Sequence, residues 1–106
     1  MLELSKIKQV VYSFWGYCGR AGFDRREWLE DRADRFSLSG IADRNGRLVI
    51  GTLIQSGWLR IPCDITDIRL YMCLYTIGHT LWLELAFHEE GSNELIIYKY
   101  RKQQSL

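Results

Sequence analysis

Two runs of strand-like alternation, Ile68 to Ile77 and Thr80 to His88, stand on either side of the dipeptide Gly78-His79. A two-residue loop that begins with glycine is typical of a type II′ hairpin turn, because its first central residue needs a positive φ. Placing Ile77 opposite Thr80 gathers apolar side chains on one face, which predicts that this face is buried. A slip by one residue would exchange the two faces, so the pattern selects the register. The predicted buried positions are Leu70, Met72, Leu74, Leu83, Leu85 and Phe87.

An amphipathic helix is predicted over residues 3–18, where apolar side chains recur at helical spacing. We expect Ile7, Val11 and Phe14 on this helix to pack against the apolar face of the hairpin. Glycines at Gly16, Gly19 and Gly22 predict its C-terminal end, through a glycine C-cap.

A second helix is predicted from Asp24, because Asp24 and Glu27 have the spacing of a capping box. Its apolar side is narrow, and acids and bases alternate around the rest, which favours a solvated helix with salt bridges. The alternative is a basic docking patch, although the interleaved acids largely cancel it. That patch would consist of Arg25, Arg26, Arg32 and Arg35.

The rest of the chain reads as short strands joined by tight turns. Asn45-Gly46 predicts a hairpin between residues 37–44 and 47–55, and a further strand over 58–61 stops at Pro62. The last strand, residues 94–101, has two possible registers. A four-residue loop before it buries Ile96, Tyr98 and Tyr100, and a five-residue loop buries Leu95 and Ile97.

Short turns forbid parallel crossovers. The prediction is therefore one α+β domain over residues 1–106, with two N-terminal helices packed on an antiparallel β-meander of about five to six strands.

The composition of the chain limits its class and location but does not indicate a function. The chain has 106 residues, 47% hydrophobic and 25% charged, with a net charge of +1, the profile of an ordinary globular domain. The N-terminus has no signal-peptide pattern, and no apolar run approaches the roughly 20 residues that span a bilayer. Three widely spaced cysteines, Cys18, Cys63 and Cys73, favour free thiols and a cytoplasmic location.

Candidate chemistry is sparse. Cys63, Cys73, His79 and His88 fit no compact zinc spacing. In the predicted hairpin Cys73 and His88 lie about 13 Å apart, too far for a nucleophile–base pair. We therefore expect no catalytic residues, no metal and no cofactor.

The second face of the hairpin is the candidate binding site. It mixes aromatic and ionisable side chains, a composition found in protein-binding surfaces and in single-stranded RNA platforms. Alternatively, the second helix or a partner subunit covers this face, and it is not a binding site. Glu84 at the centre and the near-neutral net charge favour protein over nucleic acid. The candidate residues are Arg69, Tyr71, Tyr75, Trp82, Glu84 and His88.

The predicted function is therefore a small non-catalytic protein-binding domain: an inhibitor, an immunity protein or an adaptor of a mobile element. That assignment follows from size and the lack of a chemical site. A nucleic-acid-binding module that uses the same face is the alternative. An exposed last strand would also permit a homodimer through a sheet edge.

Overall fold

A computed structural model describes residues 3–37, 57–63, 65 and 67–103. The predicted hairpin around Asn45-Gly46 lies outside these residues. The elements, in chain order, are helix α1 (Leu4–Arg20), the 3-10 turn η1 (Arg25–Glu27), and strands β1 (Leu29–Ser37), β2 (Leu59–Ile61), β3 (Ile68–Ile77), β4 (Thr80–Glu89) and β5 (Glu94–Gln103).

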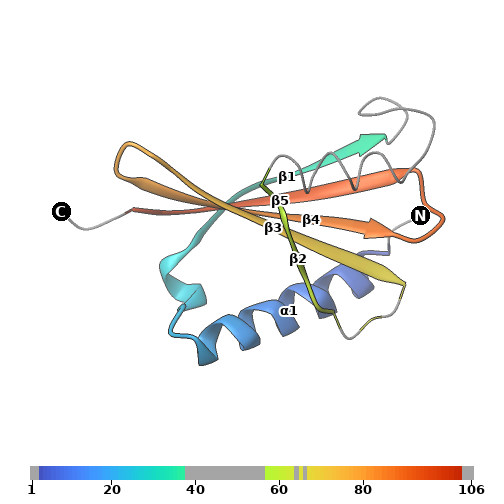
Figure 1. Ribbon diagram of the computed structural model, residues 1–106, viewed down its shortest axis with the longest axis horizontal. Coiled ribbons are helices and arrows are strands. Elements are labelled where there is room, and N and C mark those ends of the chain that lie inside the picture. The colour runs from blue at the N-terminus through green and yellow to red at the C-terminus, as the bar shows by residue number, and fades with distance from the viewer. Residues whose placement is uncertain (1–2, 38–56, 64, 66, 104–106) are drawn as a thin grey trace.

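The strands form one antiparallel sheet in the order β1-β5-β4-β3-β2, and α1 lies along one of its faces (Figure 1). The α+β class is confirmed, but the arrangement is not a simple meander of the predicted kind. Only β2 to β5 follow each other as neighbours, because β1 pairs with β5 at the far edge of the sheet.

The central hairpin has the predicted register. Ile77 pairs with Thr80, and the pairing continues without a shift to Arg69 opposite His88. Gly78 has a φ of +60°, whereas His79 is not among the residues with positive φ, which is the pattern of a type II′ turn. The loop into β5 leaves Phe87 opposite Ile96, so the four-residue alternative is correct.

Helix α1 ends two residues later than predicted, in a Schellman motif. Gly22, with a φ of +93°, donates its N–H to the carbonyl of Gly19, and Phe23 donates to the carbonyl of Cys18. Gly22 therefore provides the predicted glycine cap, whereas Gly16 and Gly19 lie within the helix.

The predicted second helix is wrong. Asp24 accepts a hydrogen bond from the N–H of Arg26, as an N-cap would, but only one 3-10 turn follows, and the chain enters β1 at Leu29. Strand β1 pairs with β5 across ion pairs from Arg35 to Glu94 (3.3 Å) and from Arg101 to Asp31 (3.7 Å). The alternating charges therefore belong to a solvated edge strand, because pairing with β5 outweighs a weak local helix preference.

The main core lies between α1 and the sheet, as predicted, with one exception. Leu74 points to the helix side of β3, yet it is 45% exposed. Among the described strands, β2 pairs with β3 only at Leu70 to Met72, so Leu74 lies beyond the paired part of that edge. The buried core comprises Ile7, Val10, Phe14, Trp15, Trp28, Ile68, Leu70, Leu83, Leu85, Phe87, Ile96 and Tyr100, with Val11 and Met72 partly buried against it.

The last strand is not a free edge, because β5 pairs with both β4 and β1. Among the described strands the edges are β1 and the three-residue β2. β5 therefore offers no free edge to another chain, and the dense charge of β1 disfavours such pairing at that edge.

Candidate functional site

The six candidate residues lie on the face of the sheet opposite α1, which follows from the observed register. The structure separates them into two groups at opposite ends of the β3–β4 hairpin. Arg69, Tyr71 and His88 lie toward the end of the hairpin that is remote from its turn, and Tyr75, Trp82 and Glu84 lie toward the turn.

Tyr71 and His88 are buried, contrary to the expectation of an accessible patch. Tyr71 is 0% exposed and forms a second, smaller core with Ala86 and Leu95, on which Trp58 and Ile97 pack. His88 is 7% exposed. Neither side chain is accessible to a partner, and Trp58, the residue before β2, packs against the cluster that contains Tyr71.

The polar atoms of this second core are incompletely paired. His88 places Nε2 3.2 Å from the carbonyl of Ser92, while its Nδ1 and the hydroxyl of Tyr71 have no hydrogen-bond partner among the residues that the structure describes. Burial raises the pKa of Tyr71, and the nearby charges of Arg60 and Arg69 oppose that shift. Tyr71 therefore acts through packing, with an unsatisfied hydroxyl as a cost.

Near the turn, the second face remains partly accessible. Tyr75 and Trp82 are half-buried and lie opposite each other, and the row continues through Arg101 on β5 to Leu29 on β1, both exposed. Sequence reasoning did not include Leu29 and Arg101, since only the observed pairing of β1 and β5 brings them into this row.

Glu84 is neutralised by a neighbour that the sequence did not identify. Lys99 on β5 lies directly opposite, with its Nζ 3.5 Å from the Glu84 carboxylate. Burial and the hydrogen bond to Glu84 raise the pKa of Tyr75 to about 12. Burial and the charge of Glu84 also raise the pKa of Cys73, so its thiol is a poor nucleophile.

An apolar pocket of about 160 Å³ opens on the helix side of the same end of the hairpin. It lies between the C-terminal part of α1, the chain around η1, and strands β2 to β4. Within the described part of the chain no charged side chain lines it, and burial raises the pKa of the Cys18 thiol, which keeps that group neutral. The lining residues are Phe14, Trp15, Tyr17, Cys18, Ala21, Phe23, Trp28, Ile61, Met72, Leu74 and Leu83.

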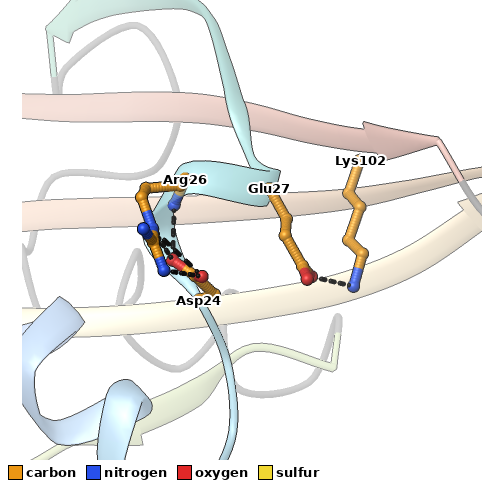
Figure 2. A network of polar contacts seen from close by, with 4 residues as sticks. All are labelled: Asp24, Arg26, Glu27 and Lys102. Carbon is orange, nitrogen blue, oxygen red and sulfur yellow. Dashed lines mark hydrogen bonds and ion pairs between the residues drawn. The ribbon is translucent and has the colours of Figure 1, made fainter.

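Ion pairs around η1 fix one wall of this pocket. Figure 2 shows Arg26 paired with Asp24, and Glu27 paired with Lys102 on β5. The nitrogen–oxygen distances of these pairs are 2.9 Å and 2.6 Å. The Glu27–Lys102 pair joins the segment from Phe23 to Trp28 to the sheet.

Arg25 supports this wall from outside the pocket. Its guanidinium lies 5.3 Å from the ring of Trp15 and 5.1 Å from that of Tyr100, and it donates to the carbonyl of Trp28 at 2.6 Å. The first two contacts hold the rings of Trp15 and Tyr100 in place through cation–π attraction. Sequence reasoning missed the pocket because its walls come from four separate segments.

The described residues contain no group of three or more side chains suited to a metal ion. Cys73 pairs with Glu84 and His88 with Arg69, so the predicted separation of Cys73 from His88 along the hairpin is the observed one. No helix in the described part of the chain is long and apolar enough to cross a membrane. No family model, curated protein or solved structure matches this chain.

Proposed function

We propose that this domain binds another protein through the hairpin end, the surface around the β3–β4 turn and the mouth of the apolar pocket. One observation carries the proposal: five of the eight large apolar side chains exposed in the described part lie at this end, on both sides of the sheet. Tyr17, Phe23 and Leu74 border the apolar pocket on the helix side. Leu29 and Ile77 lie on the opposite face with the half-buried Tyr75 and Trp82.

The chemistry of the hairpin end favours a protein partner. Contiguous exposed apolar surface is unusual on a monomer and typical of interaction sites. Aromatic residues and arginine are enriched in protein interfaces, and here Tyr75, Trp82 and Arg101 lie in one row. An inhibitor, an immunity protein or an adaptor would each use such a surface without catalysis.

Nucleic acid is the second candidate, supported by two arginines on the second face. Within the described residues, Arg60 and Arg69 form no ion pair, and both lie on the same face as Tyr75 and Trp82. Lys99 also neutralises Glu84, which weakens the sequence argument against phosphate.

Capture from the lysate of the native source, with and without nuclease, tests both candidates. We expect a protein that is retained after nuclease treatment, and we expect Trp82→Ala to lose it, because a truncated aromatic anchor typically costs more than about 1–2 kcal/mol of binding. Ile77→Asp is the second variant, because Ile77 is 63% exposed and the change should not disturb folding.

Tyr12→Ala is the matched control, since Tyr12 is 83% exposed on α1 and does not line the apolar pocket. Its capture should equal that of the unmodified chain. Equal capture by the Ile77→Asp and Tyr12→Ala proteins would disprove the proposed surface. Loss of the captured material on nuclease treatment alone would assign the face to nucleic acid.

A further inference from the structure

The apolar pocket has the features of a small binding site. Its inner walls are buried side chains of the main core, among them Phe14, Trp15, Trp28 and Leu83. Its mouth is bordered by Tyr17, Phe23 and Leu74, which are exposed.

We propose that the apolar pocket binds one uncharged apolar group of about the size of an aromatic ring. The volume is about 160 Å³, and apolar protein cavities of about 150 Å³ bind benzene. A group much larger than one ring would force the packed core apart, which is unfavourable. This chemistry is the same for a free small molecule and for an aromatic or branched side chain of a bound protein.

The lining disfavours charged ligands. Among the described residues no charged side chain lines the pocket, so a charged group placed there would lose its water without gaining a counter-ion. The thiol of Cys18 stays protonated, because burial raises its pKa. The indole N–H groups of Trp15 and Trp28 are buried and have no partner within the described part of the chain. Apolar contact is therefore the main attraction that the walls offer.

The walls are also held in place before any ligand arrives. Lys102 binds Glu27, and Arg25 lies over the rings of Trp15 and Tyr100, so the segment from Phe23 to Trp28 is anchored to both the sheet and the helix. A preformed site loses less conformational entropy on binding than one that must be ordered.

The first experiment uses the isolated, ¹⁵N-labelled chain and toluene as the probe. Of the four tryptophans, Trp15 and Trp28 line the pocket, whereas Trp58 and Trp82 do not. We expect saturable shifts of the indole N–H signals of Trp15 and Trp28, with those of Trp58 and Trp82 as internal controls. Absence of saturable shifts up to the solubility of toluene, or equal shifts of all four signals, would overturn the proposal.

A pair of matched variants locates the bound probe. Leu74→Trp places a large ring at the mouth of the pocket, and Ile77→Trp adds a ring of the same size on the same strand outside the lining. The saturable shift should disappear in the Leu74→Trp protein and persist in the Ile77→Trp protein. Unchanged binding by the Leu74→Trp protein would contradict the proposed location.

The source of the apolar group is settled by adding toluene to the capture experiment. Competition with the captured protein would assign the group to a side chain of the partner, and retention of the partner would assign it to a free small molecule. The titration uses the isolated chain, so its result is independent of whether the hairpin end binds a protein.

Discussion

The two ends of the sheet differ in how many of their apolar side chains are buried, although apolar residues alternate with polar ones at both ends. At the closed end, where β3 begins and β4 finishes, both faces are covered: Phe87 and Ile96 pack under α1, and Tyr71 and Leu95 pack on the opposite side. At the hairpin end, Leu74 and Ile77 are exposed although their sequence context is equally apolar. Figure 1 shows the β3–β4 turn reaching past the C-terminal end of α1.

Polar contacts reinforce this difference. Lys6 near the start of α1 binds Asp67 at 2.8 Å and approaches Glu89 at 3.9 Å, which ties the helix to the closed end of the sheet. The hydrogen bond from Lys6 lowers the pKa of Asp67. The closed end is thus covered on both faces, whereas the exposed apolar side chains of the hairpin end contribute little to the buried core. Surface that folding does not require is available for binding.

The largest expected effect is a difference in stability between the two ends. Phe87→Ala should lower the free energy of unfolding by about 3–5 kcal/mol, because it leaves a cavity beneath α1. Ile77→Ala should change it by no more than about 0.5 kcal/mol, as for other exposed positions. Denaturant unfolding of both variants measures the difference. Similar losses would mean that the hairpin end belongs to the core.

Much of this arrangement could be predicted from the sequence because it depends on local information. Gly78 and the alternation around it determine the register of the β3–β4 hairpin, and helical spacing determines which face of α1 is buried. The four-residue loop into β5 was one of two alternatives, and the sequence could not choose, since both Ile96 and Leu95 are buried, on opposite faces.

The parts that could not be predicted depend on distant segments. Leu29 to Ser37 has no apolar alternation, so only its pairing with β5 makes it a strand. Tyr71 packs in a cluster with Trp58, which lies outside the β3–β4 hairpin. Pairing partners and the limits of a covering element are tertiary properties that a local pattern does not contain.

Tyr100 tests whether the two ends differ on every strand. Tyr100 is on β5, where it pairs with Leu83 of β4 near the hairpin end. Its side chain is nevertheless fully buried and packs against the ring of Trp15. Burial raises the pKa of Tyr100 to about 12, whereas an unfolded tyrosine titrates near 10. Because the folded pKa is the higher one, stability is fully present below about pH 10 and falls as the pH rises toward 12.

The expected loss over this range is about 2–3 kcal/mol. Urea unfolding of the unmodified chain and of the Tyr100→Phe protein, at several values between pH 9 and pH 12, isolates this contribution. Tyr75 titrates in both proteins, so it cancels from the difference. If the free energy of unfolding changed with pH equally in both proteins, Tyr100 would be accessible to solvent. In that case β5, like β3, would be exposed at the hairpin end.

The smallest expected effect concerns Tyr71, whose ring and hydroxyl have opposite consequences at the closed end. The ring fills the second core, but the hydroxyl is buried without a partner. Removing an unsatisfied buried group while keeping its shape is neutral or stabilising. Tyr71→Phe should therefore leave the free energy of unfolding unchanged or raise it by up to about 1 kcal/mol.

Tyr71→Ala is the control that separates the two parts of the side chain. Losing the ring should cost about 3–5 kcal/mol, as for other large core truncations. Denaturant unfolding of both proteins at neutral pH gives the comparison. A loss of more than about 1 kcal/mol in the Tyr71→Phe protein would reveal a hydrogen bond made by the hydroxyl. If Tyr71→Ala lowered the free energy of unfolding only slightly, the side chain of Tyr71 would be accessible, as the sequence predicted. The closed end would then be covered on one side only.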